Sequence, residues 1–61
     1  MIFEKAKELA EKEGMSISEL EANCNIGNGT ISKWKNSSPT IANLKKVADY
    51  FNVPIEYFLK E

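Results

Sequence analysis

The stretch from Met15 to Trp34 constrains the fold most, because it predicts two short helices joined by a tight turn. Ser16 and Glu19 have the spacing of a capping box, in which each side chain bonds the backbone N–H of the other residue at a helix start. Asn25 suits the left-handed backbone that ends one helix and redirects the chain. A short polar helix held at an angle by the helix before it is the arrangement that places side chains in a DNA groove.

The distribution of charge supports this interpretation. The formal net charge is −1, yet residues 27–46 contain four lysines and no acid. Residues 1–26 contain six glutamates and three lysines, and residues 47–61 are also net acidic. Four lysines alone would indicate an ordinary solvated surface. Their coincidence with the predicted second helix favours a nucleic-acid partner.

Length and composition predict a single domain over residues 1–61. A chain of 61 residues is close to the lower size limit for folding without disulfides or metals. Its hydrophobic share of 43% is ordinary for a globular protein. The one cysteine, Cys24, cannot form an internal disulfide, so we expect a small core residue in an intracellular protein. No apolar run fits a membrane span or a secretory signal, so no membrane partner is expected.

Residues that carry catalysis are scarce in this chain. There is no histidine, so the usual general base near neutral pH is missing. Cys24 therefore has no histidine to activate it, and the three glycines do not form a phosphate-binding pattern. We expect no enzymatic activity, no metal, no cofactor and no small-molecule substrate.

Helical periodicity without any strand signal predicts an all-α bundle. Thr40 is expected to cap one helix and Asn52 to end it in a left-handed conformation. That helix has the strongest periodicity in the chain, through Ile41, Leu44, Val47, Ala48 and Phe51. The five expected helices cover about residues 2–13, 17–24, 28–36 and 41–51, and the last begins near Pro54.

From Phe3 to Leu59 the chain resembles the phage repressor and Cro-like (XRE-type) helix-turn-helix family. The matching positions are Glu19-Leu20, Asn25-Ile26, Thr30 to Asn36, Pro39-Thr40-Ile41, Leu44, Val47-Ala48, Phe51-Asn52-Val53, Ile55 and Tyr57-Phe58-Leu59. The resemblance implies a compact five-helix, lambda-repressor-like domain that binds double-stranded operator DNA, usually as a symmetric pair. It also implies repression of transcription, in the cytoplasm of a bacterium or a phage-infected cell. The chain equally fits the N-terminal part of a longer repressor.

Three positions depart from the pattern of that family. Ile17 stands where the family often has glutamine, so only backbone amides at this helix start can hold phosphate. Glu21 replaces a small residue packed close to the next helix, and we expect its carboxylate to bend outward to water. Asn25 replaces the usual glycine of the turn, which its tolerance of left-handed geometry allows.

DNA contacts are expected mainly from the helix at 28–36 and the loop after it. Because the chain has no arginine and no glutamine, base choice depends on few side chains. Asn28 can pair with adenine, although it is equally a candidate helix cap, and Lys33 can donate to guanine. The expected base contacts are Asn28, Gly29, Thr30, Ser32 and Lys33. The expected phosphate contacts are the amide of Ile17, Ser18, Lys35, Asn36, Ser37, Ser38, Thr40 and Asn43.

Three other functions remain open at this point. A protein-interaction module uses the same fold without reading DNA, and the acidic flanks, Glu21 and the lack of arginine favour it. An antitoxin would bind DNA and also cover a toxin. Trp34 could stack single-stranded bases, but its helical spacing from Ile31 favours a core position.

Overall fold

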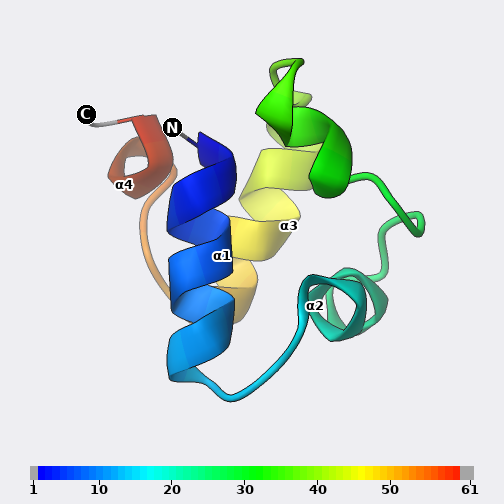
Figure 1. The fold of residues 1–61 in the computed structure, drawn as a ribbon. Helices are drawn as coiled ribbons and strands as arrows, with labels where there is room; N and C mark the ends of the chain where they lie inside the picture. The colour runs from blue at the N-terminus through cyan, green and yellow to red at the C-terminus, as the bar shows by residue number, and fades with distance from the viewer. Residues whose placement is uncertain (1, 60–61) are drawn as a thin grey trace.

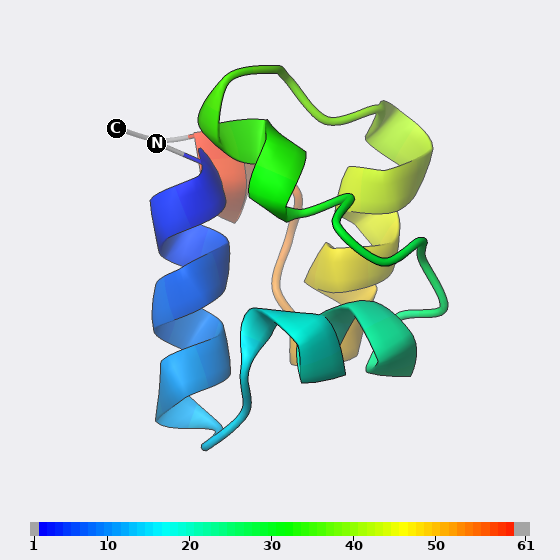
Figure 2. The ribbon, with the colours of Figure 1, turned by 45° about the vertical axis from the view of Figure 1, so that its right-hand side comes forward.

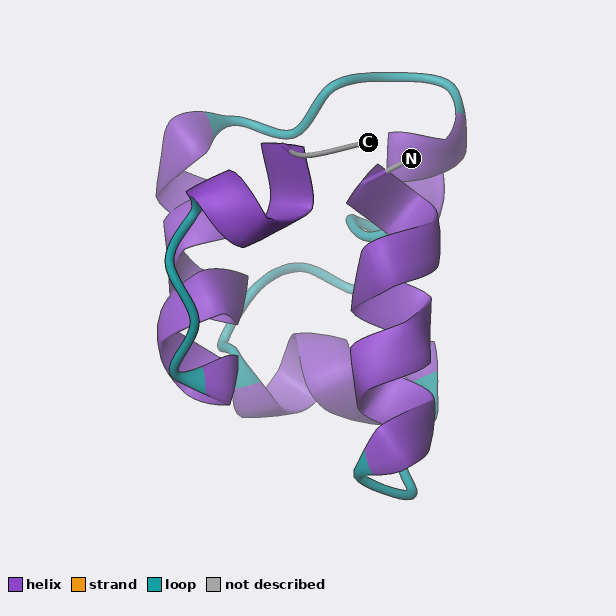
Figure 3. Ribbon diagram, turned by 90° about the vertical axis from the view of Figure 1, so that its left-hand side faces the viewer, coloured by secondary structure: helices purple, strands orange, loops and turns teal. Residues whose placement is uncertain are grey.

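The computed structural model describes residues 2–59, in which the chain forms four α-helices and one short 3-10 helix (Figure 1). In chain order these are α1 (Ile2–Lys12), α2 (Ile17–Asn23), η1 (Ser32–Lys35), α3 (Ile41–Phe51) and α4 (Glu56–Leu59). No strand occurs between residues 2 and 59 (Figure 3), and the all-α prediction is confirmed. The α-helix expected at 28–36 is wrong, because turns cover residues 28–31 and η1 follows them. Across the same described residues, no helix is long and apolar enough to span a membrane.

Both ends of α2 follow signals that are local in the sequence. The Ser16 hydroxyl oxygen accepts a hydrogen bond from the Glu19 N–H (3.1 Å), and the Glu19 carboxylate accepts one from the Ser16 N–H (2.8 Å). The predicted capping box is therefore confirmed. Asn25 has a φ of 58°, the left-handed conformation predicted for it. This turn redirects the chain from α2 toward η1 (Figure 2).

The capping residues of α3 are also confirmed, but its apolar face is shorter than the sequence indicates. The Thr40 hydroxyl oxygen accepts from the Asn43 N–H (3.2 Å), and Asn52 ends the helix at a φ of 58°. The buried residues of this helix are Leu44, Val47 and Ala48. Ile41, expected on the same face, is 66% exposed. Ile41 is the first residue of α3, next to the loop from η1. The apolar spacing of the sequence includes this residue, but the core does not extend so far.

The core gathers buried residues of α1, α2 and α3, and η1 and α4 pack against α1. Its buried apolar residues are Ala6, Ala10, Leu20, Cys24, Ile31, Trp34, Leu44, Val47, Ala48 and Phe58. Trp34 is only 6% exposed, so the expected core position is confirmed and its ring offers no stacking surface. Cys24 is buried as predicted. The core therefore draws on every helix of the described chain.

Burial raises the pKa of the Cys24 thiol above its ordinary value of 9.0, because the thiolate loses hydration there. The unfolded chain therefore ionises first, and stability that is complete below about pH 9 falls as the pH rises further. We expect the free energy of unfolding, measured in urea, to fall more steeply from about pH 8 to about pH 10 in the wild type than in Cys24→Ala. The slopes are compared because alanine also leaves a cavity. Equal slopes would contradict the prediction.

Candidate nucleic-acid interface

The segment after the Asn25 turn, residues 27–37, is held by short-range backbone hydrogen bonds. The Thr30 N–H donates to the carbonyl of residue 27 (3.1 Å), and the Trp34 N–H donates to the carbonyl of Ile31 (2.9 Å). These bonds join residues that are three apart, which is the spacing of a 3-10 helix rather than an α-helix. The expected α-helix is therefore replaced by a tighter turn in which side chains three apart lie above one another.

Glu21 of α2 holds this segment, although its carboxylate was expected to bend outward to water. The side chain is only 2% exposed. One carboxylate oxygen accepts from the Gly29 N–H (2.9 Å) and the other from the Ile31 N–H (2.8 Å). The prediction was wrong because the turn leaves these two amides without helical acceptors, and a buried carboxylate satisfies both. The sequence signal for this role is an acid where a small residue was expected, followed by a glycine-rich segment.

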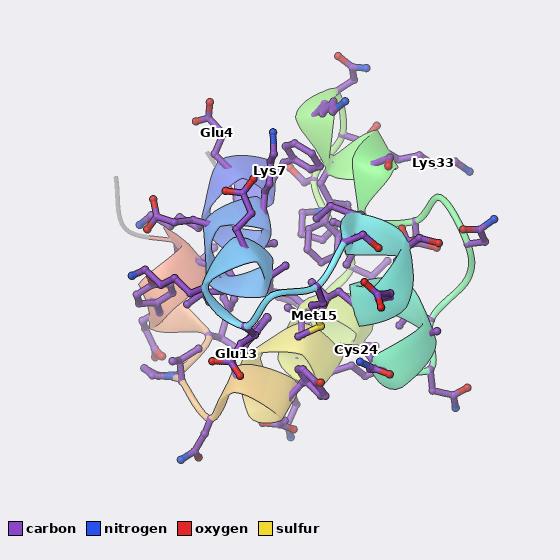
Figure 4. The ribbon with its side chains drawn as sticks, turned by 60° about the horizontal axis from the view of Figure 1, so that its bottom comes forward. Glu4, Lys7, Glu13, Met15, Cys24 and Lys33 are labelled. Carbon is purple, nitrogen blue, oxygen red and sulfur yellow. The ribbon has the colours of Figure 1, made fainter. Side chains whose placement is uncertain are left out.

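Lys33 is the exposed cation at the centre of the segment. Its side chain extends away from the body of the molecule (Figure 4). Its main chain is fixed, since the Lys33 N–H donates to the carbonyls of Gly29 (3.3 Å) and Thr30 (3.2 Å). The Lys33 carbonyl accepts from the N–H groups of Asn36 (3.1 Å) and residue 37 (2.9 Å). A flexible charged side chain therefore projects from a defined backbone position.

The other expected base-contacting residues differ in what they present. Asn28 and Ser32 are exposed, and Thr30 is half-buried. Asn28 does not cap η1, because the residue that flanks its start is Ile31, which has no capping side chain. Gly29 offers no free amide, since its N–H is bonded to Glu21. Of the two roles considered for Asn28, the structure removes the capping role.

One shallow hollow brings expected base contacts and expected phosphate contacts together. Its walls come from residues 27–37, the following loop and the first turn of α3. The hollow is lined by Thr30, Lys33, Trp34, Ser37, Ser38, Pro39, Thr40 and Asn43. Three of the four hydroxyls sit in or beside the loop, and the Thr40 hydroxyl also caps α3. Hydroxyls, an amide and a lysine in one concave surface are groups that hold phosphate oxygens.

The remaining expected phosphate contacts line other hollows or begin α2. Ser18 lines a second hollow together with Asn28, beside Glu21. Lys35 and Asn36 line a third one, which adjoins the hollow beside Lys33 because both are lined by Trp34 and residues 37–39. The Lys35 ammonium lies over the Phe3 ring, 5.0 Å from its centroid. The half-buried Ile17 begins α2, so its amide stands at a helix start as expected.

The charged side chains in and around residues 27–46 are distributed unevenly. Residues 27–46 contain no acid, and the lysines at 33, 35, 45 and 46 are all exposed. The carboxylate that reaches the segment, that of Glu21, is buried against backbone amides. Glu4 and Lys7 project from α1, on a different side of the molecule from Lys33 (Figure 4). The exposed charged side chains of residues 27–46 are therefore all lysines, although the net charge of the whole chain is −1.

Comparison with known proteins gives one result that covers most of the chain. A family model described as helix-turn-helix matches residues 7–58. No curated protein and no solved structure matches the chain. The matched range includes α2, the Asn25 turn, η1 and the whole of α3.

Proposed function

The chain belongs to the helix-turn-helix family of the Cro/repressor type, and from this membership we propose that it represses transcription by binding a specific operator. The family comprises DNA-binding transcription regulators. In the proposed complex, residues 27–37 enter the major groove of double-stranded DNA and α2 crosses the backbone. Two chains bind as a symmetric pair, in the cytoplasm of a bacterium or a phage-infected cell, as a regulator of phage or mobile-element type.

The hollow beside Lys33 is the observation that supports this proposal most directly. It joins a side chain able to donate to guanine with hydroxyls and an amide suited to phosphate. Phosphate contacts fix the position and orientation of a base-reading surface on the duplex. Here the groups suited to bases and those suited to phosphate share one concave face. The base-contacting set we propose is Asn28, Gly29, Thr30, Ser32 and Lys33, with Gly29 contributing through its Cα, since its N–H is bonded to Glu21 and its carbonyl to the Lys33 N–H.

Selection from a library of random duplexes tests the proposal. We expect a short, palindromic site, with half-sites about 34 Å apart where two chains bind. Footprinting on the selected duplex should then protect those half-sites. Absence of enrichment at low salt, with the protein folded by circular dichroism, would contradict the proposal.

Lys35→Ala is expected to weaken binding to every duplex by the same factor. We propose that this residue contacts phosphate, so its loss should also make the slope of log K against log salt shallower by about 0.9. Titrations of the selected duplex and a scrambled duplex over a range of salt give both quantities. Lys12→Ala removes the same charge from the exposed end of α1 and should leave the slope unchanged. A changed base preference in Lys35→Ala would contradict its assignment to phosphate.

Amide chemical-shift mapping separates this proposal from a protein-interaction role. Perturbation by duplex DNA should centre on residues 27–43. The exposed Leu59 on α4 and the exposed glutamates of α1 (Glu4, Glu8 and Glu11) are where a protein partner would bind instead. If DNA causes no shifts and a partner protein shifts α1 and α4, the interaction module or antitoxin alternative is favoured.

A further inference from the structure

Glu21 is the one buried charged side chain in the described part of the chain, and it reaches into the proposed base-contacting segment. Its two carboxylate oxygens accept from the Gly29 N–H (2.9 Å) and the Ile31 N–H (2.8 Å). We propose that Glu21 is a positioning residue for base reading, which sets where Asn28 and Lys33 stand. This inference rests on the proposed function, since it concerns how the same surface chooses its bases.

The bonds around Gly29 explain how one carboxylate affects two side chains. Gly29 follows Asn28 directly, and its carbonyl accepts from the Lys33 N–H (3.3 Å). The Gly29 N–H is bonded to Glu21 at the same time. A displacement of this residue therefore moves the backbone of Asn28 and loosens that of Lys33 together. Because Glu21 lies in the middle of α2, the carboxylate ties the reading segment to the helix that is to cross the DNA backbone.

The start of the segment needs such a tie because the backbone of Gly29 is free to adopt other conformations. Gly29 has a φ of +87°, which glycine adopts without strain. A glycine backbone also has many other accessible conformations, so Gly29 does not fix this one by itself. The start of η1 has no capping side chain, since Ile31 occupies that position. A carboxylate that accepts two N–H groups supplies the missing cap from outside the segment. Charge-assisted hydrogen bonds in a buried position are stronger than neutral ones, which makes this cap an effective constraint.

The packing of the core depends less on the Glu21 carboxylate than the position of residues 28 and 29 does. Ile31 and Trp34 anchor the far end of the segment by burial. Asn28 and Gly29 lie before that anchor, and Asn28 is exposed. Loss of the carboxylate should therefore release residues 27–30 while the helices remain packed. Such a change alters base choice more than it alters the fold.

Glu21→Gln tests the inference with the smallest change in shape. Glutamine has one acceptor oxygen, and its NH2 group is a donor, so one of the two amides must lose its acceptor. In the free protein, hydrogen exchange at Gly29 or Ile31 should become about tenfold faster, the factor expected for one lost hydrogen bond. Glu11→Gln removes the same charge from an exposed position on α1 and should leave both rates unchanged.

The second measurement is the discrimination ratio, which is Kd for a duplex with one substituted base pair divided by Kd for the selected duplex. The substituted pairs are those whose preference depends on Asn28 or Lys33. We expect Glu21→Gln to lower this ratio about fivefold or more, since one bidentate base contact contributes discrimination of that order. Partial unfolding lowers affinity for every duplex by the same factor and leaves the ratio unchanged, so the ratio reports positioning.

The outcomes separate the inference from the proposed function. If the wild type selects no site, the proposed function fails, and this inference fails with it. If the wild type selects a site but Glu21→Gln keeps the wild-type ratio, the inference alone is overturned. If Glu21→Gln does not fold, exchange in the wild type decides, because clamped amides at Gly29 and Ile31 should be protected about a hundredfold or more relative to a free peptide. Unprotected amides there would overturn the inference.

Discussion

Phe58→Ala is expected to cause the largest loss of stability of any substitution proposed for this chain, lowering the free energy of unfolding by about 3–5 kcal/mol. Phe58 is among the largest fully buried side chains, at 1% exposure, and its ring meets that of Tyr57 edge to face at 5.4 Å. Truncating a buried phenylalanine costs about 3–5 kcal/mol. A domain of 61 residues has a total free energy of unfolding of only roughly 3–9 kcal/mol. The substitution therefore removes from about a third to all of the stability.

Leu59→Ala is the matched control, because Leu59 is the next residue of α4 and is 55% exposed. Urea titrations followed by circular dichroism measure the free energy of unfolding of both variants. We expect Leu59→Ala to stay within about 1 kcal/mol of the wild type, as exposed substitutions usually do. Equal losses in the two variants would show that α4 does not close the core in solution in the way described above.

The parts of the fold that were predicted correctly depend on short-range chemistry. The Ser16–Glu19 box, the Thr40 cap and the left-handed Asn25 and Asn52 each need only a few neighbouring residues to form. A hydroxyl beside a free amide, or an asparagine after the last turn of a helix, behaves similarly in any fold. These signals placed the helix ends to within about a residue, which boundary conventions alone can shift.

The error at 28–36 has a different physical origin. Ile31 and Trp34 are three residues apart, and that spacing puts both on one side of an α-helix or of a 3-10 helix. Periodicity over so short a segment cannot separate the two. Gly29 decided the outcome, since its positive φ breaks a regular helix just before the apolar pair. The same limit explains Ile41, where the apolar pattern continues past the end of the core.

The burial of Glu21 could not be predicted from the sequence for a related reason. A carboxylate is placed inside only when specific donors need it, and those donors are backbone amides eight and ten positions away. In an α-helix over 28–36 those amides would have been at a helix start open to water, and Glu21 would have had no reason to be buried. One mistaken secondary structure thus produced a second error in side-chain placement. The proximity of Thr30 and Lys33 to the expected phosphate contacts at 37–43 was easier to predict, because these residues come from adjacent stretches of chain.

Lys33→Ala is expected to have the largest effect on DNA recognition. Its ammonium is the one exposed cation of residues 27–34, and its backbone is anchored on both sides by hydrogen bonds within the turn. A good bidentate contact to guanine contributes about 1–3 kcal/mol of discrimination, which is roughly a factor of 5 to 150. We expect affinity for the selected duplex to fall within that range, and the preference for one base pair in each half-site to be lost. Competition titrations with singly substituted duplexes measure both.

Lys7→Ala supplies the matched control, because Lys7 is exposed on α1 and projects on a different side of the molecule (Figure 4). It removes the same charge and should lower affinity for all duplexes slightly and equally. Asn28→Ala should act like Lys33→Ala but at a different base pair, where adenine is preferred. If Lys33→Ala weakens every duplex equally, Lys33 contacts phosphate instead. Base choice would then depend on Asn28, Thr30 and Ser32. With only these side chains reading bases, the protein would bind DNA with weak sequence specificity.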